Sequence, residues 1–196
     1  MKIIITRHGE TLENQEGIIQ GNLPGTLSQK GIEQAEKLAE RLKEEKLDKV
    51  FSSDLARSSD TTRIILKYHK EVPVEFTREL RERNLGELQG KRKEDLGIDK
   101  NKLVGDYLSN KEGETSEQMF ERGKVFINKL INNFPEKTIL LVGHNGINKA
   151  IILTILGKTI ENIREIESQK NTAITIINIK NDRITMKVHN CIKHLE

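Results

Sequence analysis

The chain has 196 residues, of which 35% are hydrophobic and 32% are charged, with a formal net charge of +3 at pH 7. This length fits one domain with a sizeable core, so we expect a single domain over residues 1–196 without repeats or linkers. The small net charge gives no reason to expect nucleic acid, and without an apolar run long enough for a signal peptide or a membrane span we expect a cytoplasmic protein.

The first half of the chain alternates short apolar runs with helical patterns. Residues 2–6, KIIIT, are dominated by β-branched side chains, as expected for a strand covered on both faces. Ser28 then precedes an amphipathic helical pattern that extends to Leu42. The next expected elements are a strand over 49–53, a helix from Asp54 to about Tyr68, and a strand over 74–76.

The second half continues this alternation after an irregular stretch at 86–113, in which we expect short helices. Thr115, with Gln118 three residues later, makes a capping-box pattern at the start of a long helix. The last expected elements are a strand over 138–142, a helix from Ile147 to Leu156 that Gly157 ends, and a closing hairpin over 172–179 and 183–188. The alternation predicts a three-layer α/β/α sandwich with a mostly parallel central sheet.

Two histidines follow expected strands, each near a glycine. His8 comes after the strand over 2–6, and His144 comes after the strand over 138–142. Because open parallel sheets bind ligands beyond the carboxyl ends of their strands, we expect both histidines in one site. A lone histidine in such a place is more often structural, and that interpretation is kept for His69, His189 and His194.

Cationic and amide side chains accompany these histidines. Arg7 adjoins His8, Asn14 follows shortly after, and Arg57 lies near the start of the helix after the strand over 49–53. Arginine side chains and helix N-termini match phosphate oxygens, so a phosphoryl group is the expected occupant. Nearby positive charge should lower the pKa of a histidine, and a neutral imidazole is a competent nucleophile toward phosphorus.

The leaving alkoxide needs a proton, which a carboxylic acid can donate when a neighbouring anionic substrate raises its pKa. Three glutamates in the segment ELRERNLGELQG, at 79–90, are candidates: Glu79, Glu82 and Glu87. Their spacing alone does not select one of them.

A series of ordered motifs resembles the histidine phosphatase superfamily, in the branch of the cofactor-dependent phosphoglycerate mutases and many small phosphatases. The motifs are TRHGET with Asn14, QG at 20–21, TLSQKGIEQA at 26–35, FSSDLARSSDTT at 51–62, LRERNLGELQG at 80–90, GETSEQ at 113–118 and LVGHNG at 141–146. Together they cover nearly the whole chain, which makes the signal far more specific than an isolated Arg-His-Gly.

The resemblance implies a phosphoglycerate mutase-like fold and a histidine-type acid phosphatase that uses no metal and no cofactor. By resemblance, His8 becomes phosphorylated, Glu82 is the acid and then activates water, and the phosphate is surrounded by Arg7, Arg57 and His144. We expect further substrate contacts at Asn14, Gln20, Gly21 and Asn145. Thr26, Ser28 and Gln89 depart from the residues usual in the family, which concerns the identity of the substrate rather than the reaction.

Phosphatases and mutases of this kind share the phosphohistidine and differ in the acceptor, which is water or a second hydroxyl. Mutases have a long insertion after the acidic residue, whereas here only residues 83–113 separate Glu82 from Glu114. We therefore favour a phosphomonoesterase acting on a small phosphorylated metabolite over phosphoglycerate mutase-type transfer. A non-catalytic module that binds phosphorylated ligands is less favoured, because the histidines, the arginines and Glu82 are all present.

A metal-dependent hydrolase is a further alternative, with ligands His8, Glu10, Glu82 and His144. It lacks the paired histidines at one-turn spacing that are typical of such sites. The lone Cys191 excludes an internal disulfide.

The basic segment GKRKEDL, at 90–96, is interpreted first as a solvated helix start. Alternatively, a second anionic group of the substrate is contacted there by Lys91, Arg92 or Lys93. Both a monomer and a homodimer are compatible with the sequence, since the C-terminal edge strands could pair between subunits.

Overall fold

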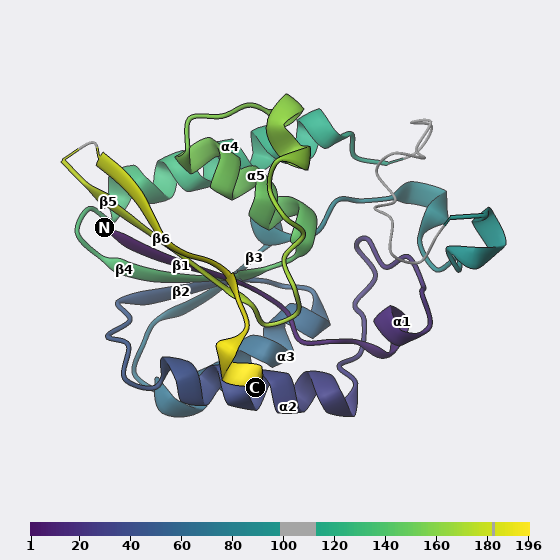
Figure 1. The fold of residues 1–196 in the computed structure, drawn as a ribbon, viewed down its shortest axis with the longest axis horizontal. Coiled ribbons are helices and arrows are strands. Elements are labelled where there is room, and N and C mark those ends of the chain that lie inside the picture. Colours follow the sequence, from purple (N-terminus) through teal and green to yellow (C-terminus); the bar gives the residue numbers. More distant parts are fainter. Residues whose placement is uncertain (99–112, 182) are drawn as a thin grey trace.

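The computed structural model describes residues 1–98, 113–181 and 183–196 and is built around a six-stranded sheet (Figure 1). The strands are β1 (Lys2–Arg7), β2 (Lys49–Ser53), β3 (Val74–Thr77), β4 (Thr138–Gly143), β5 (Ile174–Lys180) and β6 (Arg183–Cys191). They lie in the order β3-β2-β4-β1-β5-β6. Strands β1 to β4 are parallel to one another, whereas β5 and β6 form the antiparallel closing hairpin. The expected mostly parallel sheet is confirmed.

Helices cover both faces of this sheet. Helices α2 (Gln29–Leu42) and α3 (Ala56–Ile65) lie on one face, and α4 (Ser116–Asn133) and α5 (Asn145–Ile155) lie on the other (Figure 1). The other short helices of the described residues are α1 (Leu12–Gln15), η1 (Leu66–Tyr68), η2 (Arg78–Leu80), η3 (Gly86–Leu88), η4 (Glu94–Leu96), η6 (Ile160–Arg164) and η7 (Lys193–Leu195). The three-layer α/β/α sandwich is therefore confirmed.

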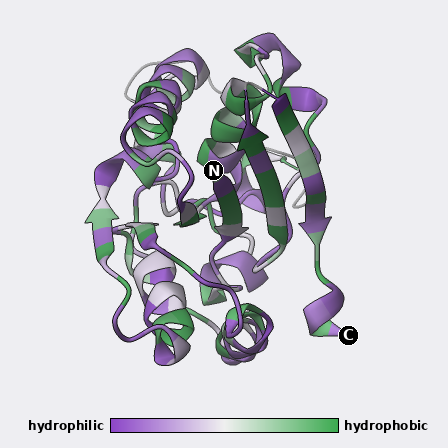
Figure 2. Cartoon of the chain, turned by 90° about the vertical axis from the view of Figure 1, so that its left-hand side faces the viewer, coloured by the Kyte–Doolittle hydropathy of each residue, from purple (hydrophilic) through white to green (hydrophobic). Residues whose placement is uncertain are grey.

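Alternate residues of the central strands supply the two hydrophobic cores. Ile3 and Ile5 of β1 pack in the cluster beneath α4 and α5, whereas Ile4 packs in the cluster beneath α2. In Figure 2 the central strands are largely hydrophobic, and the flanking helices carry many hydrophilic residues. Burial on both faces explains why β1 and β4 are almost continuous apolar runs in the sequence.

Local sequence signals set several helix starts. The Ser28 side chain accepts a hydrogen bond from the Gly31 amide at the start of α2, and Thr115 with Gln118 forms the expected capping box of α4. The expected starts of two helices, α3 and α5, were wrong by two residues. Helix α3 begins at Ala56 instead of Asp54, because the Asp54 carboxylate binds Arg81 instead of capping a helix.

Helix α5 begins at Asn145 instead of Ile147, directly after His144. The short helices expected in the irregular stretch are present as η3 and η4, and the rest of that expectation falls on residues 99–112, outside the described part. Within the described ranges, no helix combines the length and apolar character needed to cross a membrane.

Candidate active site

The register of β1 against β4 brings the two histidines together. Arg7 pairs with Gly143 at the end of both strands, so His8 and His144 are the next residues on neighbouring strands. The His8 amide donates to the Gly143 carbonyl at 3.1 Å, and the two imidazole rings lie 5.1 Å apart between centroids. Parallel pairing alone therefore places both side chains at one point of the sheet edge.

Glycines allow close approach of the chain behind His8. A Cβ at Gly9 would lie 2.4 Å from the Gly31 carbonyl oxygen, and a Cβ at Gly31 would lie 1.9 Å from the Glu10 carbonyl oxygen. The first turn of α2 thus packs directly on the backbone that follows His8. Any larger side chain at either glycine would push this backbone out of place.

Hydrogen bonds define the tautomer of His8. Its Nδ1 lies 2.7 Å from the Gly9 carbonyl oxygen, which only accepts, so Nδ1 carries the proton. Nε2 is therefore the nitrogen with the free lone pair, and it accepts from Arg57 Nε at 3.3 Å. His8 is 3% exposed, so this orientation is fixed within the protein.

His144 has the opposite tautomer. Its Nδ1 accepts from the same Arg57 Nε at 3.2 Å, which leaves the proton on Nε2. Nε2 lies 2.9 Å from Ser53 Oγ and 3.3 Å from Ser58 Oγ, and either hydroxyl can accept that proton's hydrogen bond. The lone pairs of both imidazoles thus face one guanidinium N–H.

Arg57 is held by backbone carbonyls as well as by the histidines. Its Nη2 donates to the Gly21 carbonyl at 2.8 Å, and its Nη1 donates to the carbonyls of Leu23 and Pro24. The side chain is only 1% exposed. Burial and the charge of Arg7 lower the pKa of Arg57 to about 10, while Glu82 opposes this shift, so the guanidinium stays charged near neutral pH.

Arg7 adds a second guanidinium. Its Nη1 donates to the Gln169 carbonyl at 2.9 Å, while its Nε is buried without a hydrogen-bond partner within the described residues. A buried charged donor without an acceptor is costly. An anion bound between the histidines and the arginines would lower that cost.

The environment lowers the pKa values of His8 and His144 well below the usual value, as the sequence suggested. However, burial is the main cause for both histidines, followed by the positive charge of Arg57. Arg7 also lowers the pKa of both, and His8 and Arg122 lower that of His144. The sequence led us to expect that nearby positive charge alone lowers these pKa values, because it does not show how deeply the strand ends are buried. Both imidazoles are neutral near pH 7.

The structure distinguishes among the three candidate glutamates. Glu82 Oε2 accepts from the Gly146 amide at 3.1 Å, which places its carboxylate at the N-terminus of α5, two residues beyond His144. A Cβ at Gly146 would lie 2.5 Å from Glu82 Oε1. Glu79 and Glu87 are both exposed, and the Glu79 side chain binds Thr77 instead.

The four residues expected to contact the substrate each make a hydrogen bond within the protein. Asn14 Oδ1 accepts from the Thr11 amide, and Gln20 Nε2 donates to Thr11 Oγ1 while its buried Oε1 has no partner in the described part of the chain. The Gly21 carbonyl holds Arg57. Asn145 Oδ1 accepts from the Gln169 amide. Their contacts with a substrate stay predictions.

Sequence reasoning missed the hydroxyl groups that line α3. Ser58 lies beside His144, and Thr61 Oγ1 accepts from the Gly9 amide at 3.0 Å. Both are fully buried. The signal was present, since hydroxyl residues at 58, 61 and 62 share one helix face just after a strand end.

Two further residues near the end of β1, Asn148 and Gln169, were not expected from the sequence. Asn148 Nδ2 donates to the Thr6 carbonyl and to Gln169 Oε1, and Gln169 Nε2 donates to the Ile5 carbonyl. These bonds connect α5 and the segment that holds Arg7 to the end of β1. No local pattern in the sequence indicates them.

Several residues named as ligands in the metal-dependent alternative are engaged in other contacts. Arg57 Nε lies between the two histidines, and Glu10 turns to Gln15, Ser28 and Lys30. Among the described residues, no three His, Cys, Asp or Glu side chains are grouped to hold a metal ion.

The basic cluster at 90–96 contributes an ion pair with the residue that follows α1. Arg92 Nη2 lies 2.8 Å from Glu16 Oε2, and both side chains are about half exposed, whereas Lys91 is exposed. A contact of this cluster with a second anionic group of the substrate stays a prediction.

Comparison with known proteins identifies relatives of the whole chain. A family model described as "Histidine phosphatase superfamily (branch 1)" matches residues 3–192. Phosphoglycerate mutase-like protein 4 of Arabidopsis thaliana is 30% identical over 204 residues, covering 100% of this chain and 87% of that protein. Metal-independent phosphoserine phosphatase of the same plant is 32% identical over 162 residues, covering 79% and 68%. The alpha-ribazole phosphatase structure from Shigella flexneri has a TM-score of 0.86 and 27% identity, covering 98% and 97%.

Proposed function

The chain belongs to the histidine phosphatase superfamily, and from this premise we propose that it is a metal-independent phosphomonoesterase acting through a phosphohistidine at His8. Its substrates are small phosphorylated metabolites. The proposal treats residues 1–196 as one catalytic domain in the cytoplasm.

One observation carries the proposal: Arg57 Nε is shared between His8 Nε2, at 3.3 Å, and His144 Nδ1, at 3.2 Å. A cationic donor, a nucleophilic nitrogen and a second imidazole therefore converge on one point. Phosphoryl transfer needs this combination, since most of its catalysis is positioning and stabilisation of charge on the transferred group.

In the first half-reaction, the His8 Nε2 lone pair attacks phosphorus and forms the N–P bond. The bond between phosphorus and the leaving oxygen breaks, and Glu82 gives its proton to that oxygen. Arg7 and Arg57 stabilise the charge on the equatorial phosphoryl oxygens. The Nδ1–H bond to the Gly9 carbonyl supports the partial positive charge that develops on the His8 ring.

In the second half-reaction, Glu82 is a carboxylate and takes a proton from water. The resulting hydroxide attacks phosphorus, the N–P bond breaks, and its electron pair returns to His8 Nε2. Inorganic phosphate leaves, and both residues are restored to their starting protonation states. Transfer to a second substrate hydroxyl, as in a mutase, would use the same phosphohistidine with a different acceptor.

The names of the relatives support the reaction and leave the substrate open. Two of them are called phosphatases, one for phosphoserine without a metal and one for alpha-ribazole. The third is called phosphoglycerate mutase-like. Phosphoserine and an alpha-ribazole phosphate have little in common besides the phosphoryl group, so the names point to the reaction and not to one substrate.

Trapping of the intermediate tests the proposal. Protein quenched during turnover of a radiolabelled phosphomonoester should carry phosphate that is labile to acid and stable to base, and His8→Ala should carry none. The variant His69→Ala is the matched control, because His69 binds the Leu42 carbonyl away from the site. Label on His8→Ala, or turnover that a chelator abolishes, would contradict the proposed mechanism.

A further inference from the structure

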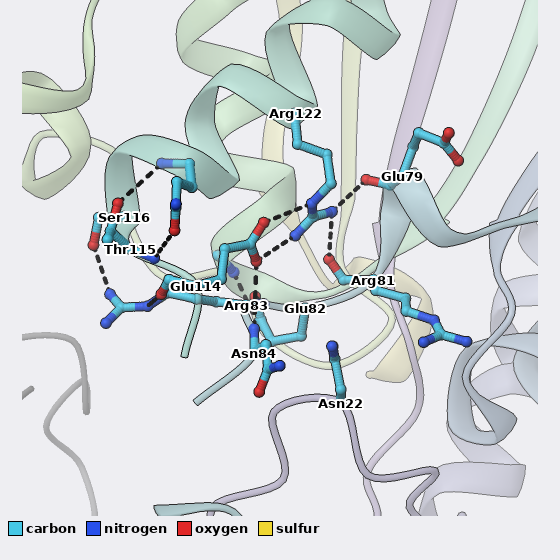
Figure 3. Close-up of polar contacts among 12 residues, drawn as sticks. Asn22, Glu79, Arg81, Glu82, Arg83, Asn84, Glu114, Thr115, Ser116 and Arg122 are labelled. Atoms are coloured by element: carbon cyan, nitrogen blue, oxygen red, sulfur yellow. Dashed lines mark hydrogen bonds and ion pairs between the residues drawn. The ribbon is translucent and has the colours of Figure 1, made fainter. Parts of the chain in front are cut away.

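The segment that carries Glu82 lacks regular backbone pairing. A backbone bond from the Glu114 amide to the Asn84 carbonyl, at 2.9 Å, holds it, and side chains supply further contacts. Helix η2 ends at Leu80, and residues 81–84 belong to neither a helix nor a strand. Figure 3 shows that the side chains of Arg122 and Glu114, from the first turns of α4 and the segment just before them, reach this segment. The position of Glu82 therefore depends on contacts with an element more than thirty residues later in the sequence.

Arg122 makes contacts on the N-terminal side of Glu82. Its Nη1 donates to the Glu79 carbonyl at 2.6 Å and to the Arg81 carbonyl at 3.0 Å. Its Nε and Nη2 donate to the two oxygens of Glu114, each at 2.7 Å. One guanidinium thus joins α4 to two backbone carbonyls before Glu82, in the two-pronged geometry that only arginine provides.

Glu114 makes the matching contact on the C-terminal side. Its Oε2 accepts from the Asn84 amide at 3.3 Å. Arg83, the neighbour of Glu82, also donates to the Glu114 carbonyl at 2.9 Å. Backbone groups on both sides of Glu82 are therefore fastened to one ion pair.

This ion pair is more enclosed than another on the same helix. The side chains of Arg122 and Glu114 are 23% and 17% exposed, whereas those of Lys124 and Glu121 are 46% and 58% exposed. An exposed pair such as Lys124–Glu121 contributes little to stability. The Arg122–Glu114 pair, in contrast, also forms hydrogen bonds with the backbone on both sides of Glu82.

We propose that Arg122 and Glu114 are positioning residues, which hold Glu82 where it protonates the leaving oxygen. The inference rests on the proposed function and adds to it the side chains that place the proton donor. The side-chain hydrogen bonds of Arg122 and Glu114 connect these two residues to each other and to the backbone around Glu82, so both act through Glu82. Loss of either should weaken protonation and leave attack by His8 intact.

The test compares an alkyl phosphate, such as glycerol phosphate, with an aryl phosphate, such as 4-nitrophenyl phosphate. An aryl oxide leaves with little protonation, so only the alkyl ester depends strongly on the acid. We expect Arg122→Gln and Glu114→Gln to lower the rate of phosphohistidine formation, measured by rapid quench, by about 10- to 100-fold for the alkyl ester and by about 3-fold or less for the aryl ester. This step precedes the activation of water by Glu82, which both esters share. Lys124→Gln, on the same helix, is the control and should leave both rates unchanged.

A double-mutant cycle supplies a result that a merely structural role would not produce. In a Glu82→Gln background, Arg122→Gln should no longer change the ratio of alkyl to aryl rates, because both changes act on one proton transfer. Glu114→Gln keeps the side-chain shape, so it tests the same point if Arg122→Gln does not fold. Thermal melting followed by circular dichroism identifies folded variants.

Each outcome decides the inference. Equal losses in the rate of phosphohistidine formation for both esters in folded variants, or an undiminished effect in the Glu82→Gln background, would overturn it while the proposed function stands. If the wild-type protein hydrolyses neither ester nor any other phosphomonoester, the proposed function is overturned and this inference with it.

Discussion

The two halves of the proposed site are built in different ways. The cluster of Arg7, His8, Arg57 and His144 follows three strand ends, where parallel pairing and backbone carbonyls set the geometry. Glu82 lies on an irregular segment, where side chains of α4 and the residues before it set the geometry. The arginines and histidines proposed to face the phosphoryl charge are thus placed largely by the main chain, whereas the proposed proton donor depends mainly on a few side-chain bonds.

The largest expected effect on kcat comes from a change in the cluster at the strand ends. Arg57→Gln should lower kcat by about 100- to 1,000-fold for alkyl and aryl phosphates alike, because charge on the transferring group develops with either leaving oxygen. Steady-state rates on both esters measure this effect. Arg63→Gln is the control, since Arg63 lies on the same helix but its side chain is 64% exposed and pairs with Asp60. A loss confined to the alkyl ester would show that Arg57 acts through the leaving group instead.

A smaller effect, selective for one kind of ester, is expected from a change of Glu82 on the irregular segment. Glu82→Gln keeps the side-chain shape but can neither donate a proton nor activate water. We expect kcat to fall about 100-fold for an alkyl phosphate, and the rate of phosphohistidine formation to fall less than about 5-fold for an aryl phosphate. Rapid-quench measurement of the phosphoenzyme separates the two steps. Glu87→Gln, on the same segment but exposed, is the control, and a larger loss there than at Glu82 would identify the other glutamate as the acid.

The smallest expected effect is a shift in titration. Because burial and positive charge lower the pKa values of His8 and His144 below 6.5, both rings should stay neutral as the pH falls through that value. The unfolded chain takes up these protons first, so stability should decline as the pH falls below about 6.5 and continue to decline until the folded pKa values are reached.

NMR titration of the imidazole carbon-bound protons checks this directly. Arg57→Gln should raise both pKa values only in part, since burial remains. Full protonation of His8 or His144 at pH 6.5 in the wild-type protein would contradict the expectation.

Much of the architecture could be predicted from local sequence. Continuous apolar runs indicated the buried strands, and the Ser28 cap and the Thr115 capping box marked two helix starts. His8 and His144 could be placed together because parallel strands end at one sheet edge, and their order in the chain shows which residue follows each strand. These features depend on nearest neighbours in sequence and on a few general rules of sheet geometry.

By itself, then, the sequence determined the alternation of strands and helices, the helix caps and the convergence of the two histidines with Arg57. Only the tertiary structure placed the Glu82 carboxylate at the start of α5, set Arg57 Nε between the two imidazoles and made burial the main cause of the low histidine pKa values. The reason is physical. A helix cap or an apolar strand is specified within a few residues, whereas the contacts of Glu82 come from α5 and its backbone is held by α4, so their geometry exists only after the layers have packed.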